Sequence, residues 1–335
     1  MTGHRAAQPP EGPRRARSWV VTGGVGFIGY HLTRALLARG DRAVVVDDFS
    51  DAPYPRAAKR RNARDLEAEF GDAVRVAHAC VIDRAAIEPC FDGADGVLHL
   101  AGLAGVRPSF RSPSRYARVN VEGTANVLEI ARDRGIRRVV FASSSSVYGN
   151  STPLPAREDA PAVAPESPYA ASKRGGELVA STLARQTPEM HVTGLRFFTV
   201  YGARQRPEMA ITLFARAILE GRPFTVFGDG SMRRDFTHVD DIVRGVLAAA
   251  DRAPAGFRVY NLGSGAPITL RDLVQALVLS CGREAKIERA DVPLGDVDAT
   301  YADIARARDE LDWAPRISLT DGIATVVDWV KQNPG

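Results

Sequence analysis

The segment Thr22-Gly23-Gly24-Val25-Gly26-Phe27-Ile28-Gly29 follows the apolar run Trp19–Thr22 and leads into a helical pattern at 27–39. Its glycines permit a tight turn and let backbone N–H groups approach an anion at the N-terminus of the helix. A glycine motif of this kind is informative only between a strand and a helix, which is where this one lies. The segment therefore predicts a strand–turn–helix unit that binds the pyrophosphate of a dinucleotide.

A carboxylate at the end of the second apolar run indicates which dinucleotide binds. Asp47 stands 18 residues after Gly29 and follows the run Ala43–Val46. A carboxylate there accepts hydrogen bonds from the adenosine ribose hydroxyls and meets a 2′-phosphate as a like charge. We therefore expect NAD as the cofactor, in preference to NADP. A glycine-rich turn without a ligand is the alternative, and Asp47 counts against it.

Short apolar runs alternate with helical patterns over the first 200 residues. The predicted strands are Trp19–Thr22, Ala43–Val46, Val74–Ala77, Gly96–Leu100, Arg138–Ala142 and His191–Phe197. The predicted helices cover 27–39, 83–90, 114–134 and 168–186. This alternation predicts an α/β fold with a doubly wound parallel sheet of the Rossmann type.

Beyond residue 200 the pattern loosens into Gly- and Pro-rich connections, which indicate a smaller C-terminal lobe for the substrate. We expect the cofactor-binding domain at 18–198, with a return segment near 235–262, and the second lobe at 199–234 and 263–335. Residues 1–17 carry four arginines against one glutamate and show no apolar periodicity. Such a segment buries too little surface to offset its ordering entropy, so a disordered basic tail is expected there.

Composition argues against several classes of protein. The four arginines and one glutamate of the tail account for +3 of the net charge of +4, so the body is nearly neutral and no nucleic-acid partner is expected. No window approaches the roughly 20 apolar residues of a membrane helix, so no membrane partner is expected. Cys80, Cys90 and Cys281 are odd in number and lack CxxC spacing. This argues against a disulfide framework or a metal site and fits a cytoplasmic location.

Tyr169 and Lys173 lie four residues apart in the predicted helix 168–186, so both project from one face. The Lys173 ammonium and a positive nicotinamide ring would both favour phenolate and lower the pKa of Tyr169 toward neutrality. The strand ending at Ala142 delivers four serine hydroxyls, at 143–146, that could reach the same reacting oxygen. A YxxxK match is common by chance on a solvated helix face, so its weight depends on the neighbouring motifs.

Seven segments together resemble the extended short-chain dehydrogenase/reductases, NAD-dependent enzymes that act on nucleotide sugars, over about 18–330. They are TGGVGFIG, LHLAGLAGVRPS, NVEGTANVLE, SSSSVYG, SPYAASK, LRFFTVYGARQRPEMA and GDGSMRRDFTHVDDIV. The resemblance implies that Tyr169 and Lys173 are catalytic, and counting back from Val147-Tyr148-Gly149 places the catalytic hydroxyl on Ser144. The cofactor contacts that it implies are Gly23, Gly26, Phe27, Ile28, Gly29, Asp47, Asp48, Val81, Leu100, Ala101, Tyr169 and Lys173.

Two positions depart from the family pattern around the adenosine. The family usually has Asp after the third strand, where this chain has Cys80, and Asn after the ribose carboxylate, where it has Asp48. The adenine and ribose contacts are therefore expected to differ from the family pattern, and NAD remains the expected cofactor.

Two serines separate the reaction classes within the family. The 4,6-dehydratases carry Asp-Glu directly after the catalytic hydroxyl, where this chain has Ser145 and Ser146. Decarboxylases that make UDP-xylose usually place Glu at the position of Ser146. Neutral serines therefore indicate a plain epimerase.

The segment 199–209 is the most informative about the sugar. UDP-glucuronate 4-epimerases resemble it closely, with an arginine at the position of Arg206, and a guanidinium pairs bidentately with a carboxylate. The resemblance implies that Ser145, Thr199 and Arg206 hold the C6 carboxylate. An ion pair between Arg206 and a protein acid such as Glu208 is the alternative.

Further residues are implied for the nucleotide. Arg234 resembles the arginine that grips the diphosphate, Phe227 the residue beside uracil, and Asp296 a ribose ligand. Arg107 is expected near the substrate entrance, with a surface loop charge as the alternative.

The expected activity is 4-epimerisation of UDP-glucuronate to UDP-galacturonate through a 4-keto intermediate. A neutral UDP-sugar 4-epimerase (UDP-glucose or UDP-GlcNAc), a UDP-glucuronate decarboxylase and a non-catalytic NAD sensor remain as alternatives. Because family members commonly pair through helices like those at 114–134 and 168–186, a homodimer is expected.

Overall fold

The computed structural model describes residues 15–51, 54–292 and 299–333. Most of the predicted tail, residues 1–14, and the predicted ribose ligand Asp296 lie outside the described residues. Arg17, at the end of that tail, does not fit the prediction of disorder. Its backbone N–H donates to Asp41 at 3.0 Å and its guanidinium to Asp251 at 2.7 Å. Arg17 is therefore bonded to the folded domain.

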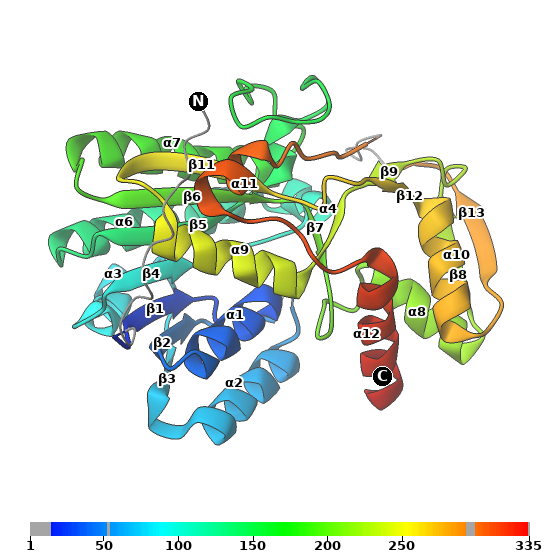
Figure 1. Cartoon of the computed structure of the whole chain (residues 1–335), viewed down its shortest axis with the longest axis horizontal. Helices are drawn as coiled ribbons and strands as arrows, with labels where there is room; N and C mark the ends of the chain where they lie inside the picture. The colour runs from blue at the N-terminus through cyan, green and yellow to red at the C-terminus, as the bar shows by residue number, and fades with distance from the viewer. Residues whose placement is uncertain (1–14, 52–53, 293–298, 334–335) are drawn as a thin grey trace, which may run out of the picture.

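The main sheet has seven parallel strands in the order β11-β6-β5-β4-β1-β2-β3 (Figure 1). These strands are β1 Ser18–Thr22, β2 Arg42–Asp47, β3 Val74–His78, β4 Gly96–His99, β5 Arg138–Ser144, β6 His191–Phe197 and β11 Gly256–Leu262. The predicted Rossmann fold class is confirmed. The strand order reverses beside β1, where the carboxyl ends of β1 and β4 meet. In such sheets the ligand binds at this switch point.

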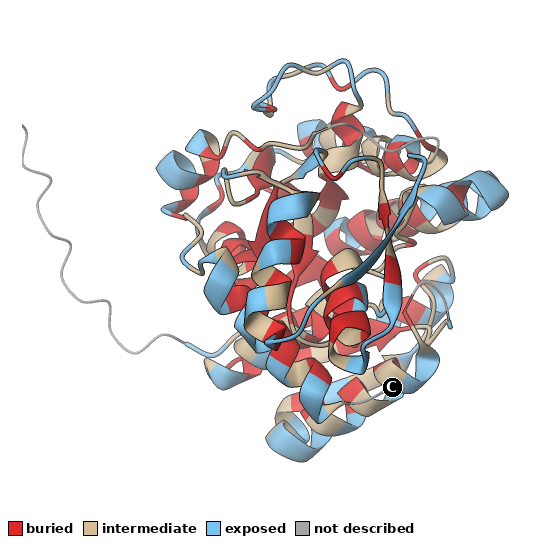
Figure 2. Cartoon of the chain, turned by 90° about the vertical axis from the view of Figure 1, so that its right-hand side faces the viewer, coloured by how far each residue is buried: buried red, intermediate tan, exposed pale blue. Residues whose placement is uncertain are grey.

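Helices cover both faces of the sheet and enclose two apolar cores. One face carries α1 Phe27–Ala38, α2 Arg56–Phe70, α9 Val239–Arg252 and α11 Ala305–Leu311. The other carries α3 Arg84–Ile87, the 3₁₀ turn Glu88–Phe91, α6 Gly123–Asp133 and α7 Pro168–Gln186. Successive strand residues alternate between the cores, so Val20 and Val21 point to opposite faces. Buried residues accordingly concentrate in the strands and on the inner sides of the helices (Figure 2).

The structure differs from the predicted helices in three places. Helix α2 was not predicted, because it buries only Lys59, Asn62, Ala63 and Leu66 and so shows no apolar stripe. The predicted helix 83–90 is α3 followed by the 3₁₀ turn. The predicted helix 114–134 is α5 Pro113–Ala117, a π-helical segment Arg118–Glu122 and α6, with a further short helix, α4 Val106–Arg111, before them.

Later segments of the chain build a third apolar core beside the sheet. Its helices are α8 Ala210–Glu220, α10 Leu270–Cys281 and α12 Leu319–Gln332. Three two-stranded sheets accompany them: β7 Thr199–Tyr201 with β10 Phe236–His238, β9 Arg233–Arg234 with β12 Ile268–Thr269, and β8 Pro223–Phe227 with β13 Lys286–Ala290. Most of these elements stand apart from the main sheet (Figure 1). Among the described residues, no helix is both long and apolar enough to cross a bilayer.

Candidate active site

The turn between β1 and α1 leaves no room for a side chain at Gly23 or Gly29. Gly23 has φ +69°, and a Cβ there would lie 2.7 Å from the backbone nitrogen of Ala101. A Cβ on Gly29 would collide with the carbonyl of Gly23. No side chain caps α1 at Gly26, so the first-turn N–H groups, which include those of Phe27 and Ile28, can bind an anion. This cradle fits the pyrophosphate of NAD.

Asp47, the carboxylate predicted to bind the ribose, forms an ion pair with Lys59. Asp47 is buried at the end of β2, and the Lys59 ammonium lies 3.0 Å from its Oδ1. Burial raises the pKa of Asp47, although the Lys59 charge and the Phe49 N–H oppose this effect. Burial also opposes the charge on Asp48, but hydrogen bonds from Ser50 and the Lys59 charge lower its pKa overall. The sequence did not reveal Lys59, which lies in the unpredicted helix α2.

Three more predicted cofactor contacts follow the carboxyl ends of β3 and β4. Leu100 and Ala101 follow β4 and donate hydrogen bonds from their backbones to Thr22, at 3.0 and 3.3 Å. Val81 follows β3 and is buried. Cys80, at the usual position of the adenine-binding Asp, is half-buried with its Sγ 3.9 Å from Asp48.

Ser144, Tyr169 and Lys173 meet where β5 ends against α7. Ser144 is the last residue of β5, and its Oγ accepts a hydrogen bond from Ser146 N–H at 3.2 Å. Tyr169 lies in the first turn of α7, whose N-cap is Ser167. Lys173, one turn later, donates from Nζ to the Ala142 carbonyl at 2.8 Å. The structure therefore brings together the three residues predicted to be catalytic.

The pKa of Tyr169 differs from the one predicted from the sequence. Burial raises the pKa of Tyr169, while a hydrogen bond with Ser144 and the charge of Arg206 oppose the rise. The residues of this chain therefore do not produce the predicted fall in the pKa of Tyr169 toward neutrality. Lys173 changes in the expected direction for a buried amine: burial lowers its pKa to about 8, and the Glu177 carboxylate opposes this fall.

A buried ionic network that sequence reasoning missed lies behind this trio. Glu177, one turn beyond Lys173, accepts hydrogen bonds from Arg196 and from the Ser143 hydroxyl, the latter at 2.6 Å. The Arg196 guanidinium lies 4.7 Å from the centre of the Tyr148 ring, and the Tyr148 hydroxyl donates to Asn261 at 2.6 Å. The four-residue spacing from Lys173 was the only sequence signal for Glu177.

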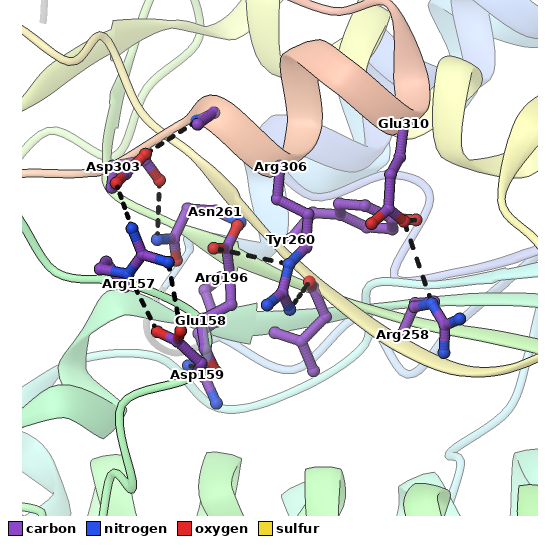
Figure 3. A network of polar contacts seen from close by, with 12 residues as sticks. Arg157, Glu158, Asp159, Arg196, Arg258, Tyr260, Asn261, Asp303, Arg306 and Glu310 are labelled. Carbon is purple, nitrogen blue, oxygen red and sulfur yellow. Dashed lines mark hydrogen bonds and ion pairs between the residues drawn. The ribbon is translucent and has the colours of Figure 1, made fainter.

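The network continues to the edge of the sheet (Figure 3). The backbone N–H of Asn261 donates to Glu158 at 2.9 Å, and Arg306 donates to the Val259 carbonyl at 3.3 Å. β11 is the edge strand of the sheet, and these two side chains hydrogen-bond backbone groups of β11 that would otherwise face solvent. The edge strand β11 and the helix α7, which carries Tyr169 and Lys173, are thus connected by one network of polar contacts.

The residues predicted to hold the sugar carboxylate have different environments. Arg206 is close enough to Tyr169 and Tyr116 for its charge to lower the pKa of each, against the rise that burial causes. Its guanidinium also lies 3.3 Å from Glu208, so the alternative pairing is present in the structure. Thr199 begins β7, and Ser145 follows Ser144; both are partly exposed.

Two of the residues predicted to bind the substrate, Arg107 and Phe227, are in direct contact. The Arg107 guanidinium of α4 lies 4.9 Å from the centre of the Phe227 ring of β8. Arg107 is exposed on α4, so its place at the substrate entrance stays a prediction beside the alternative of a surface charge. Arg234 lies in β9 and donates to the Arg233 carbonyl at 2.9 Å. Its neighbour Asp235 is fully buried and accepts backbone N–H groups of Gly265 and Ala302.

A family model described as the NAD dependent epimerase/dehydratase family matches residues 19–263. The chain belongs to this family. A UDP-glucuronate 4-epimerase of Thermodesulfobacterium geofontis is 37% identical over 94% of this chain and 96% of its own length. The structure of UDP-glucuronic acid 4-epimerase from Bacillus cereus with UDP-glucuronic acid and NAD is 33% identical, with a TM-score of 0.86 over 94% of this chain and 99% of that one. The UDP-glucose 4-epimerase of Thermotoga maritima with UDP-glucose is 29% identical, with a TM-score of 0.85 over 95% and 100%.

Membership in the NAD dependent epimerase/dehydratase family confirms the resemblance and the cofactor inferred from the sequence. His99, the last residue of β4, was not among the predicted site residues, although it lies near enough to Lys173 to be affected by its charge. Burial and the Lys173 charge lower its pKa to about 3, so it stays neutral while it bonds Thr22 and Thr124. Among the described residues, no cluster of His, Cys, Asp or Glu is suited to a metal ion.

Proposed function

We propose that this chain is an NAD-dependent 4-epimerase that interconverts UDP-glucuronate and UDP-galacturonate. The observation that carries the proposal is the position of Arg206, whose charge acts on Tyr169 from the loop after β7. A cation beside the reacting centre suits a sugar that carries a carboxylate. The relatives named as UDP-glucuronate 4-epimerases support the same substrate.

Tyr169, assisted by Ser144, performs the proton transfer at the sugar 4-hydroxyl. NAD, when bound in the glycine cradle, supplies hydride exchange at C4. Tyr169 takes the hydroxyl proton as C4 becomes a carbonyl, and it returns that proton when the other face of C4 is reduced. Ser144 hydrogen-bonds the reacting oxygen. Lys173, charged below a pKa of about 8, stabilises Tyr169 as the phenolate that accepts this proton.

Ser145, Thr199 and Arg206 hold the carboxylate of the 4-keto intermediate. That intermediate is a β-keto acid, which loses CO₂ when the breaking bond aligns with the carbonyl π-system. A fixed carboxylate out of that alignment suppresses the loss. Ser145 and Ser146 stand where dehydratases and decarboxylases need acids, so the chain lacks their proton-transfer groups.

One contact favours a second candidate, a 4-epimerase of a neutral UDP-sugar. Glu208 already occupies the Arg206 guanidinium at 3.3 Å. The Glu208 side chain is 54% exposed, however, and the pair is therefore weak and easily exchanged for a substrate carboxylate. This exposure is why the acidic sugar is preferred.

We further propose a cytoplasmic homodimer. The pairing surface is formed by α5, α6 and α7, and Leu178 of α7 is 51% exposed there. All three cysteines are free thiols, which suits a reducing compartment. Sedimentation at several protein concentrations tests the dimer, and Leu178→Asp should shift it toward monomer.

The function is tested by incubating the NAD-loaded protein with UDP-glucuronate, UDP-glucose, UDP-GlcNAc and UDP-galacturonate and resolving the products by NMR. The proposal requires interconversion of the two uronic acids, with turnover of the neutral sugars at least about tenfold slower. Preferential epimerisation of a neutral sugar supports the second candidate. A pentose as the main product identifies a decarboxylase instead.

A further inference from the structure

Arg204 adopts a backbone conformation that residues other than glycine rarely take. Its φ is +64°, in the left-handed region. It lies in the loop that joins β7 to α8, two residues before Arg206. Such outliers persist only where surrounding contacts hold them, and they cluster at functional sites. The contacts of Arg204 therefore indicate what this loop does.

The side chain of Arg204 is held by the two helices that flank the cofactor cradle. Its guanidinium lies 4.1 Å from the centre of the Tyr30 ring on α1. Its Nη2 donates to Asp65 of α2 at 2.7 Å, and its Nη1 donates to Asn62 on the same helix. Because Asp65 neutralises this guanidinium, Arg204 does not itself compete for an anionic substrate.

The backbone carbonyls of this loop are hydrogen-bonded by residues of α1 and of the segment just before α2. The Tyr54 hydroxyl donates to the carbonyl of Arg204 at 3.0 Å, and His31 of α1 bonds the carbonyl of Ala203 at 2.9 Å. Asn62 also donates to the carbonyl of Val25, inside the glycine-rich turn, at 2.9 Å. The turn that binds the dinucleotide and the loop that carries Arg206 thus share their supports.

The left-handed turn at Arg204 lets two nearby arginines face different partners. Arg204 packs on Tyr30 of the cofactor domain, whereas the charge of Arg206 is felt by Tyr169 and Tyr116. We propose that Arg204 is a positioning residue, which fixes the loop 202–209 so that Arg206 points at the substrate carboxylate. This inference rests on the proposed function, since it assumes that Arg206 binds that carboxylate.

The test compares Arg204→Ala and Arg204→Lys with a matched control, Arg34→Ala. Arg34 also joins α1 to α2, through two hydrogen bonds to Glu69 at 2.9 and 2.8 Å, but it does so at the surface. Calorimetry on the NAD-loaded protein gives the affinity for UDP-glucuronate and for UDP, which lacks the sugar. Hydrogen exchange of peptides covering 202–209 reports the loop without any substrate.

Arg204→Ala should weaken UDP-glucuronate binding by about tenfold to a hundredfold, because a displaced guanidinium loses its aligned bonds. Binding of UDP should change by less than about threefold. Exchange in 202–209 should rise. Arg204→Lys should give an intermediate result, since it keeps the charge but not the planar fork, and it carries the test if the alanine variant does not fold. Arg34→Ala should match the wild type.

Equal loss of affinity for UDP and UDP-glucuronate would make Arg204 a general structural residue and overturn the proposal. Unchanged exchange in 202–209 would overturn it as well. A wild-type protein that neither prefers nor epimerises UDP-glucuronate contradicts the proposed function instead. In that case increased exchange in Arg204→Ala still supports the role of Arg204 in holding the loop.

Discussion

The carboxylate of Glu177 accepts two hydrogen bonds from the guanidinium of Arg196, each 2.8 Å long, one helical turn beyond Lys173. The side chains are 0% and 2% exposed. Because Ser143 donates to the same carboxylate, the helix that carries Tyr169 and Lys173 is fixed to the ends of β5 and β6. Glu177 thus acts on Lys173 in two ways, by holding its helix and by favouring its charge.

The pH dependence of activity should report the charge on Lys173. Its pKa is about 8, so the ammonium is present below this value and is lost as the pH rises through it. If the ammonium stabilises the Tyr169 phenolate, kcat/KM should fall as the pH rises through about 8. Glu177→Gln removes a charge that raises this pKa, so the alkaline limb of the pH–rate profile should move to lower pH.

The control for this variant is Glu129→Gln, which alters an exposed pair with Arg84. It should leave the profile unchanged. Glu177→Gln should also lower the free energy of unfolding by about 3–5 kcal/mol, because it strands the buried Arg196 guanidinium. A destabilised variant whose alkaline limb stays in place would limit Glu177 to a structural role.

The sequence predicted the parts of the site that depend on local spacing. The glycine turn, the end of β2 at Asp47 and the pair Tyr169 and Lys173 are each read from residues adjacent in the chain or on one helix face. Arg196 and Lys59 could not be found this way, because their partners Glu177 and Asp47 come from other elements. Long-range pairing of charges leaves no periodic signal in the sequence.

Tyr169→Phe should keep substrate and cofactor binding but lose about 10²- to 10⁴-fold in kcat. The ring, which packs edge-on to Tyr116 with centroids 6.2 Å apart, is retained, and only the proton-transfer group is removed. Steady-state kinetics with calorimetry of UDP binding measure both effects. Near-normal turnover would remove Tyr169 from the mechanism.

Asp47→Asn should reduce the preference for NAD over NADP. In the wild type the carboxylate repels a 2′-phosphate; in the variant the Lys59 ammonium, now 3.0 Å from a neutral group, can attract it. We expect the ratio of the two affinities to fall by about tenfold or more. Titration with both cofactors measures this, and Asp72→Asn, at an exposed surface position, is the control. An unchanged ratio would mean that Asp47 does not contact the ribose.

Glu208→Gln should improve the use of UDP-glucuronate. Glu208 pairs with Arg206 at 3.3 Å, and a neutral glutamine competes less with a substrate carboxylate. Exposed pairs contribute up to about 1 kcal/mol, so KM should fall by at most about fivefold. The KM for UDP-glucose should stay the same. A rise in KM for UDP-glucuronate would show that Glu208 supports Arg206 rather than competing for it.

Arg206→Ala should separate an acidic from a neutral substrate. Without the guanidinium the sugar carboxylate is left unpaired in the site, which costs about 2–5 kcal/mol. Activity on UDP-glucuronate should therefore fall by roughly 30-fold or more, while UDP-glucose, which does not use the guanidinium, should lose far less. Arg206→Lys should restore part of the activity, because a point charge cannot reproduce two parallel bonds.

The same variant should also change the products. A carboxylate that Arg206 no longer holds can rotate into alignment with the C4 carbonyl, so a trace of pentose from CO₂ loss is expected by NMR. Steady-state kinetics of both variants on both sugars, with product analysis, measure these effects. Equal impairment on the two sugars would make Arg206 structural, and Glu208 would then be its functional partner. Only an unequal loss, larger for UDP-glucuronate, is consistent with a guanidinium that binds the sugar carboxylate.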